Sequence, residues 1–213
     1  GETWSVTLGG DTDGISFENS IAEDGSVRIT ASPDFSEAEV NPVTYNGSAN
    51  IYQEVDEDTG ARIITISEIN SDVALEFTSY CLWVTGTYNI TNTADNTLLL
   101  YLKSDPNQTI CKRMKVDGLE TEAANFYRFS STGEHTVKFA FPDKTSIPES
   151  AFYLNENLIS LNIPEGVMTL NPYSIYNCKA LSSVSLPQSL TYGNYDGLSR
   201  NTSLRSIILP DNL

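Results

Sequence analysis

Apolar and polar residues alternate along short runs in the first part of the chain. Val73, Leu75 and Phe77 share one side of such a run. Turn pairs that contain glycine separate the runs, and Asn46-Gly47 predicts a β-hairpin between two of them. A period of two is typical of antiparallel strands with one buried face. Residues 1–78 are therefore expected to form a small all-β module.

A second group of runs extends over residues 79–141. The apolar run that begins at Thr97 is short enough for a buried strand, and Asp117-Gly118 predicts a tight turn. Residues 131–133 are expected to join two further strands as a hairpin, with Val137 facing inward. Because a repeat array needs a capped N-terminal end, the strand at Val137 is also expected to form the first rung of the part that follows.

The last third of the chain repeats one pattern every 23 residues. Two columns of residues carry this period: Leu158, Leu181 and Leu204, and Pro164, Pro187 and Pro210. A fixed period of this length predicts a solenoid, in which each unit buries its apolar side against its neighbours.

A short strand is expected before each of these prolines, with buried and exposed side chains in alternation. Leu161 and Ile163 are expected to face the core in the first repeat, and Ile207 and Leu209 in the third. The outward side chains form a row of mostly small, uncharged residues, which are the candidate binding residues. They are Lys138, Ser160, Asn162, Ser183, Ser185, Ser206 and Ile208.

The return segment of each repeat carries one apolar anchor for the opposite wall, at Phe152, Ile175 and Leu198, and is expected to form a short helical turn. The fold class that follows is mainly β. We expect two small antiparallel β-sandwich-like modules, at residues 1–78 and 79–141, and then a short leucine-rich repeat solenoid at residues 142–213.

The repeats resemble a known family over roughly residues 135–213. The pattern A-F-x-x-C-x-x-L-x-S-[VIL]-x-[IL]-P is similar to that of the BspA-type (treponemal) leucine-rich repeats of bacterial surface proteins. Ala151, Phe152 and Cys178 match it, whereas Asn155 and Asn201 replace the usual cysteine. Asparagine at that position can bond the backbone of the turn, as in other leucine-rich repeats.

This resemblance implies export, often as a lipoprotein on the cell surface of Bacteroides-like bacteria. It also implies a role in adhesion or in binding host or matrix proteins. The first module resembles Ig-like or bacterial adhesin modules, and the family supplies no catalytic motif.

The formal net charge of −16 argues against nucleic acid and anionic lipid surfaces as partners, because both would be repelled. No stretch approaches the roughly 18 apolar residues that a membrane span requires. The protein is then either cytosolic, or exported with a targeting segment that this chain lacks. The Thr-, Ser- and Asn-rich composition favours an extracellular or cell-surface location. A monomer is expected.

Three cysteines allow at most one intrachain disulfide. Cys178 lies in the repeat at the position of Asn155 and Asn201, so a structural role is expected. Cys81 and Cys111 either form a bridge or remain as two buried free thiols, and the second alternative is favoured. Neither a C-x-x-C pair nor a histidine cluster is present, so no metal site and no cofactor are expected.

His135 is the only histidine and is expected at the surface. A Ser-His-Asp triad needs a histidine that takes the proton of the nucleophile. No G-x-S-x-G elbow accompanies His135, which disfavours hydrolysis by this route. The chain is therefore expected not to be an enzyme.

Acidic turns at Asp11–Gly14 and Asp56–Gly60 offer the oxygen ligands that calcium prefers, but neither completes a calcium-binding loop. Ordinary acidic turns are favoured. A glycosidase would need two carboxylates that flank a cleft. The candidates are Glu37, Glu39, Asp56 and Asp58, and all four are expected to face solvent.

Five tyrosines cluster in the return segments: Tyr153, Tyr173, Tyr176, Tyr192 and Tyr195. Such rings can stack on sugars or act as interface hot spots. Packing against neighbouring turns, with the hydroxyls in water, is the favoured alternative.

The sequence therefore favours a secreted or cell-surface binding protein whose repeat face binds an extracellular protein or glycan. One alternative is a structural spacer in a larger surface protein, without a ligand of its own. A polysaccharide-processing enzyme is a third possibility, and no motif supports it.

Overall fold

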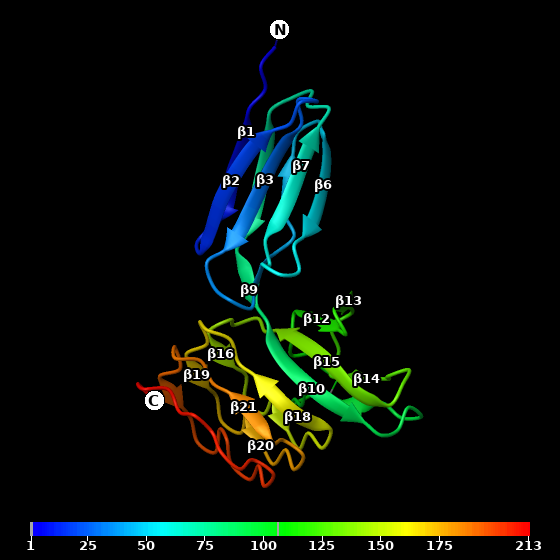
Figure 1. Cartoon of the computed structure of the whole chain (residues 1–213), viewed down its shortest axis with the longest axis vertical. Helices are drawn as coiled ribbons and strands as arrows, with labels where there is room; N and C mark the ends of the chain where they lie inside the picture. Colours follow the sequence, from blue (N-terminus) through cyan, green and yellow to red (C-terminus); the bar gives the residue numbers. More distant parts are fainter. Residues whose placement is uncertain (1, 106) are drawn as a thin grey trace. The chain divides into compact units, whose positions relative to one another are not determined.

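The computed structural model describes residues 2–105 and 107–213 of the chain. These residues divide into two compact units, Gly1–Cys81 and Leu82–Leu213 (Figure 1). Both units are built of strands, and no helix occurs in the described part of the chain. The sequence predicted a further division after residue 141. In the structure, strands on both sides of that point belong to one sheet.

The first unit packs two sheets face to face. One sheet has the order β2-β3-β7-β6 and the other β1-β8-β5 (Figure 1). The strands are β1 (Val6–Asp11), β2 (Ile15–Ile21), β3 (Val27–Pro33), β5 (Thr44–Asn46), β6 (Asn50–Val55), β7 (Arg62–Ser67) and β8 (Val73–Thr78). In addition, β4 (Ala38–Val40) pairs with β9 (Tyr80–Leu82) where the unit ends.

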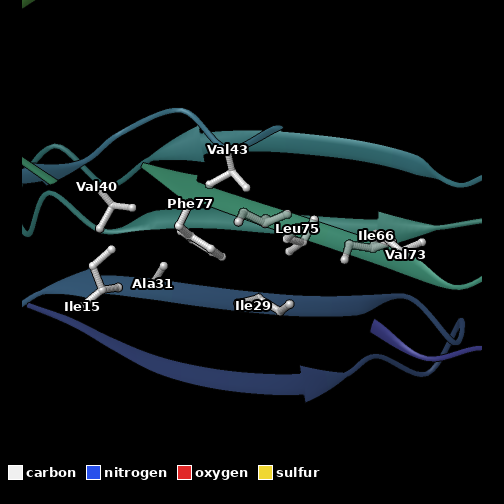
Figure 2. Close-up of a cluster of buried hydrophobic side chains, with 10 residues drawn as sticks. Ile15, Ile29, Ala31, Val40, Val43, Ile66, Val73, Leu75 and Phe77 are labelled. Atoms are coloured by element: carbon white, nitrogen blue, oxygen red, sulfur yellow. The ribbon is translucent and has the colours of Figure 1, made fainter. Parts of the chain in front are cut away.

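The core of this unit follows from the alternation in the sequence. Val73, Leu75 and Phe77 of β8 are buried, and Figure 2 shows them among Ile29 and Ala31 of β3. Ala74 and Glu76, at the positions between them, are more exposed, because successive side chains of a strand point to opposite faces. The prediction of a small all-β module is in agreement with this arrangement.

Two details of strand pairing differ from the sequence-based expectation. Asn46-Gly47 does not close a hairpin, because β5 pairs with β8 while β6 pairs with β7 in the other sheet. Gly47, at φ +118°, instead turns the chain from one sheet into the other. In addition, β1 runs parallel to β8, whereas antiparallel pairing was expected throughout.

The second unit is organised around a sheet of six strands with the order β13-β12-β15-β10-β18-β21 (Figure 1). These strands are β10 (Val84–Ile90), β12 (Arg113–Val116), β13 (Leu119–Thr121), β15 (Gly133–Ala140), β18 (Leu158–Asn162) and β21 (Ser183–Ser185). The turn at Asp117-Gly118 joins β12 to β13 as predicted.

The repeats form parallel sheets whose register equals the sequence period. Ser160 pairs with Ser183 in β18 and β21, and Leu161 pairs with Val184, so paired residues are 23 positions apart. Two further sheets follow the same offset. They consist of β16 (Ser146–Ile147), β19 (Thr169–Leu170) and β22 (Tyr192–Gly193), and of β17 (Phe152–Tyr153) and β20 (Ile175–Tyr176). The predicted solenoid is present.

The return segments of the first two repeats contain short strands and not helical turns, whereas the third, residues 195–200 with the half-buried Leu198, forms a turn. Phe152 and Ile175, the predicted anchors of the opposite wall, are fully buried and pair with each other in β17 and β20. In a two-residue strand, the backbone N–H and C=O groups of one coil form hydrogen bonds with those of the next coil. A helical turn would instead have to form these bonds within itself.

The N-terminal end of the solenoid is closed by residues that do not belong to the repeat. β10 pairs antiparallel with β18 and thereby occupies the place that the strand at Val137 was expected to fill. That strand, β15, lies on the far side of β10. The hairpin expected at residues 131–133 is also absent, because β14 (Phe126–Tyr127) pairs with β11 (Thr97–Leu98). Apolar Leu99 and Leu100, just after β11, are buried.

The third rung is less regular than the first two. Residues 206–209 form no strand, and Leu209, which was expected inside, has 56 % of its surface exposed. Among the described residues, no helix is long and apolar enough to cross a bilayer.

Candidate functional site

The predicted binding residues lie on the outward face of the large sheet of the second unit. Leu161 and Val184 point inward and are buried, which turns their neighbours outward. Ser183 and Ser185 of β21 are exposed, and Ser160 and Asn162 of β18 are half-buried. Four of the seven predicted residues are thus side by side on two paired strands.

Lys138 is on the same sheet but is not adjacent to β18. Its backbone pairs with Thr85 of β10, and Thr85 pairs in turn with Asn162. The row across the sheet therefore runs from Lys138 through Thr85 to Asn162 and Ser185. A second row runs from Thr136 through Thr87 to Ser160 and Ser183. We call these eight residues the polar face.

Thr85 and Thr87 were missed by the sequence interpretation, although a signal was present. Val84, Gly86 and Tyr88 alternate with them and are buried, so the two threonines must point outward. The sequence shows this alternation but not the partner of the strand. The insertion of β10 between β15 and β18 could not be read from it.

Ser206 and Ile208 do not join the polar face. They lie in the segment without strand pairing, and Ile208 is 84 % exposed. The structure therefore brings five of the seven predicted residues onto one sheet. Among these, Lys138 alone carries a charge.

The tyrosines of the return segments form a stack. The rings of Tyr153 and Tyr176 are parallel within 5°, with their centroids 5.2 Å apart. Tyr101 covers the other side of Tyr153 at 5.1 Å, and the guanidinium of Arg200 lies 5.8 Å from the Tyr176 ring. Because both faces of these rings are covered, they cannot offer a flat platform to a sugar.

Two further tyrosines of the predicted cluster are more exposed. Tyr195 contacts the edge of Tyr173 at 5.6 Å and is 69 % exposed, and Tyr192 of β22 is 55 % exposed. Tyr173 also meets the edges of Tyr153 and Tyr176. The geometry agrees with the favoured alternative, in which most of these rings pack neighbouring coils together.

One buried column of the solenoid holds Asn155, Cys178 and Asn201, one residue from each coil. The Cys178 thiol donates to the carbonyl oxygen of Phe152 at 2.8 Å. Asn201 Nδ2 donates to Ile175 O at 2.9 Å, and Asn201 Oδ1 accepts the N–H of Cys178 at 2.9 Å. Burial raises the pKa of the Cys178 thiol to about 11, so it stays protonated. These contacts support the structural role expected for Cys178.

No repeat coil precedes the coil of Asn155, so a carbonyl oxygen from outside the repeats accepts its hydrogen bond. Its Nδ2 donates to Leu99 O at 2.7 Å, and the hydroxyl of Tyr88 donates to the same oxygen at 3.0 Å. The segment after β11 therefore supplies the carbonyl that another repeat would provide. Cys81 and Cys111 are buried and form no disulfide, in agreement with the favoured alternative.

His135 was expected at the surface, but its side chain is only 11 % exposed. Its Nδ1 lies 2.7 Å from Asp117 Oδ2, and its Nε2 lies 2.9 Å from the carbonyl oxygen of Ser131 and 3.3 Å from Ser131 Oγ. The Phe129 ring packs against it at 4.6 Å. The residue types are therefore those of a Ser-His-Asp triad.

The hydrogen bonds of His135 disfavour that function. A carboxylate and a carbonyl oxygen can only accept, so these contacts fit the form in which both ring nitrogens carry a proton. The hydrogen bond to Asp117 raises the pKa of His135, which favours this charged form. A doubly protonated imidazole has no lone pair for the Ser131 proton, so it cannot act as a general base.

The acidic residues that were weighed as calcium or glycosidase candidates lie in or next to turns, except Glu39, which lies near Arg62. Asp11 Oδ1 accepts the backbone N–H of Asp13 at 3.2 Å, and Asp56 Oδ1 accepts that of Asp58 at 3.0 Å. Within the described residues, no group of three or more His, Cys, Asp or Glu side chains is placed to hold a metal ion. Glu39 was expected to face solvent, but it is buried, and its Oε1 lies 3.7 Å from Arg62 Nη2.

The comparison with known families agrees with the repeat geometry. Residues 124–213 match the family described as BspA type Leucine rich repeat region (6 copies). No curated protein and no solved structure matches the chain. Residues 124–213 are a BspA-type leucine-rich repeat region.

Proposed function

We propose that this chain is an exported, cell-surface binding protein and that its polar face docks an extracellular protein or glycan. The BspA-type repeats belong to a family that is associated with surface binding proteins. Adhesion is the role that this proposal assigns, and recognition requires no catalytic residue.

One observation carries the proposal. Strands from two different parts of the chain, β10 and the repeats, converge in one sheet, and Lys138 is the only charged residue among the eight of the polar face. Six of the eight residues of the polar face are Ser or Thr, and all of these except Thr85, whose hydroxyl is buried, can donate and accept hydrogen bonds with a partner. A partner can therefore cover this face without burying unpaired charges.

The experiment replaces residues at the exposed side of the face. The double variant Ser183→Arg and Ser185→Arg places two bulky cations on β21, where both serines are exposed and the fold does not depend on them. Binding of the full chain to arrays of glycans and of purified host matrix proteins is then compared with the unchanged protein. We expect binding to fall at least about tenfold, as is typical when the centre of an interface is disturbed.

A matched control separates the face from general charge effects. Ser130→Arg adds a cation at an exposed serine outside the polar face and is expected to leave binding unchanged. If the double variant binds as well as the control, the polar face is not the site. If the unchanged chain binds nothing on either array, the spacer alternative replaces the proposal.

A further inference from the structure

The first unit contains a hollow that neither its core nor the repeats use. It has a volume of about 270 Å³ and is lined mainly by side chains of β5, β6 and β7. Tyr45 and Tyr52 contribute aromatic rings, and Asn50, Thr65 and Ser67 contribute an amide and two hydroxyls. The tyrosines are 44 % and 63 % exposed, so they are accessible to a ligand.

The polar residues of the hollow are adjacent by strand pairing. Tyr52 lies opposite Thr65, and Asn50 lies opposite Ser67, in the antiparallel pair of β6 and β7. Their neighbours Ile64 and Ile66 are fully buried, which fixes these side chains on the outer face. The rigid sheet thus holds an aromatic ring, an amide and two hydroxyls within a few ångströms of one another.

Tyr45 comes from the opposite sheet, and Gln53 ties β6 to the chain segment just before it. The side chain of Gln53 accepts the N–H of Val43 at 3.0 Å and donates to the carbonyl oxygen of Val43 at 2.6 Å. This pair of bonds ties β6 to the segment two residues before Tyr45. The two rings therefore flank the hollow before any ligand arrives, which lowers the entropy cost of binding.

The amide of Asn50 is also oriented in advance. Its Nδ2 donates to Glu68 Oε2 at 2.7 Å, which uses one amide hydrogen and satisfies the carboxylate. None of the residues that line the hollow carries a formal charge. The chemistry of the site is therefore that of aromatic faces combined with neutral donors and acceptors.

We propose that this hollow binds one neutral sugar residue. The C–H face of a sugar ring packs on tyrosine, and its hydroxyls match the amide and the hydroxyls of β6 and β7. The volume is slightly below the range of about 300–1,000 Å³ for pockets that enclose drug-sized ligands, which suits one sugar and not a longer chain. The net charge of −16 disfavours acidic sugars. This site is independent of the polar face.

The test is a titration of the full chain with single sugars, followed by two-dimensional NMR. The probes are glucose, galactose, mannose, N-acetylglucosamine, N-acetylgalactosamine, fucose and xylose. We expect at least one of them to shift the amide signals of residues 45–53 and 65–68 in a saturable way. An affinity near the millimolar range is expected for so few contacts.

Variants identify the groups responsible. Tyr52→Ala is expected to weaken binding about tenfold or more, whereas Tyr52→Phe, which keeps the ring, is expected to bind nearly as well. Gln53→Met removes the tie to Val43 and is expected to weaken binding while both tyrosines remain. Tyr192→Ala, at an exposed ring in the other unit, is the matched control and is expected to have no effect.

Three results would overturn the proposal. The first is that no sugar of the panel shifts these signals. The second is that Tyr45→Ala and Tyr52→Ala bind as well as the unchanged chain. The third is that choline shifts the signals while the sugars do not, because the two rings would then act as a cage for a quaternary cation. None of these results bears on the polar face, which is tested by different variants.

Discussion

The thiol of Cys178 donates a hydrogen bond to the carbonyl oxygen of Phe152 at 2.8 Å. One coil later, Asn201 makes the equivalent bond to Ile175 at 2.9 Å. Cysteine and asparagine are therefore interchangeable in this column because both place a donor at the same carbonyl. The column ties each coil to the one before it.

We predict that Cys178→Asn keeps the stability of the fold within about 1 kcal/mol, whereas Cys178→Ala lowers the free energy of unfolding by about 1–3 kcal/mol. Alanine leaves the buried carbonyl of Phe152 without this donor. Urea denaturation measures both values. Equal losses in the two variants would show that volume, and not the hydrogen bond, is what the site requires.

A second prediction concerns the charge of His135. Its pKa should lie above the ordinary value of about 6.5, because Asp117 holds the proton on the ring. Asp117→Asn keeps the turn, since asparagine tolerates the φ of +49° found there, and should bring the pKa back down. NMR titration of the imidazole protons reads this value directly. An unchanged pKa in Asp117→Asn would contradict the ion pair.

The same pair makes stability depend on pH. Because folding raises the pKa of His135, its protonated ring stabilises the fold. This contribution is complete below the pKa of the unfolded state, and it is lost as the pH rises through the pKa of the folded state. Partial burial raises the pKa of Asp117, but hydrogen bonds from His135 and from the Thr136 backbone outweigh it, so the pKa is lowered overall. The contribution of Asp117 to stability is present above its pKa in the unfolded state. It is lost as the pH falls through its pKa in the folded state.

The pair therefore contributes most between about pH 4 and pH 6.5, the ordinary values of the two groups. We predict that His135→Gln costs more stability at about pH 5 than at about pH 9, as measured by urea denaturation at both values. A loss of the same size at both pH values would mean that the ring acts only by packing against Phe129.

Ile163 and Leu209 occupy the same position of the repeat, two coils apart, in different surroundings. Ile163 is 2 % exposed, whereas Leu209 is 56 % exposed. Ile163→Ala is expected to lower the free energy of unfolding by about 2–5 kcal/mol, and Leu209→Ala by less than about 0.5 kcal/mol. Thermal or urea unfolding of the two variants checks the difference. A large loss for Leu209→Ala would place that residue in the core after all.

Gly47 lies at the crossing between the two sheets of the first unit. A Cβ at this residue, where φ is +118°, would collide with the carbonyl oxygen of Asp72. Gly25 has a φ of +83° but open space around it, which makes it the control. Gly25→Ala should cost about 1–3 kcal/mol from backbone strain, and Gly47→Ala distinctly more. Similar losses for the two, measured by urea denaturation, would argue against the close approach of β8.

Most strands and their inward faces could be predicted, because both depend on neighbours along the chain. The alternation of Val73, Leu75 and Phe77 gives the same buried face in any sheet. Pairing between distant strands could not be predicted in this way. The alternation in β10 is compatible with many partners, and packing of the whole unit decides that it lies between β15 and β18.

The candidate site, too, could be predicted from the sequence only in part. The period placed Ser160 beside Ser183 and Asn162 beside Ser185, since parallel coils in register must align residues 23 positions apart. It also predicted Ser206 and Ile208 in the next rung, where the structure has no strand. A period states which residues are equivalent, but each coil forms a rung only if its hydrogen bonds and buried contacts are made.

The sequence by itself determined the repeat, its register and the side of each rung that faces outward, because these follow from a fixed period and the alternation of a strand. Only the tertiary structure decided how Thr85 and Thr87 enter the polar face and that Tyr45 and Tyr52, from two sheets, line one hollow. It also decided that His135 lies within hydrogen-bond distance of both Asp117 and Ser131. Each of these depends on contacts between residues far apart in the chain, which local pattern does not encode.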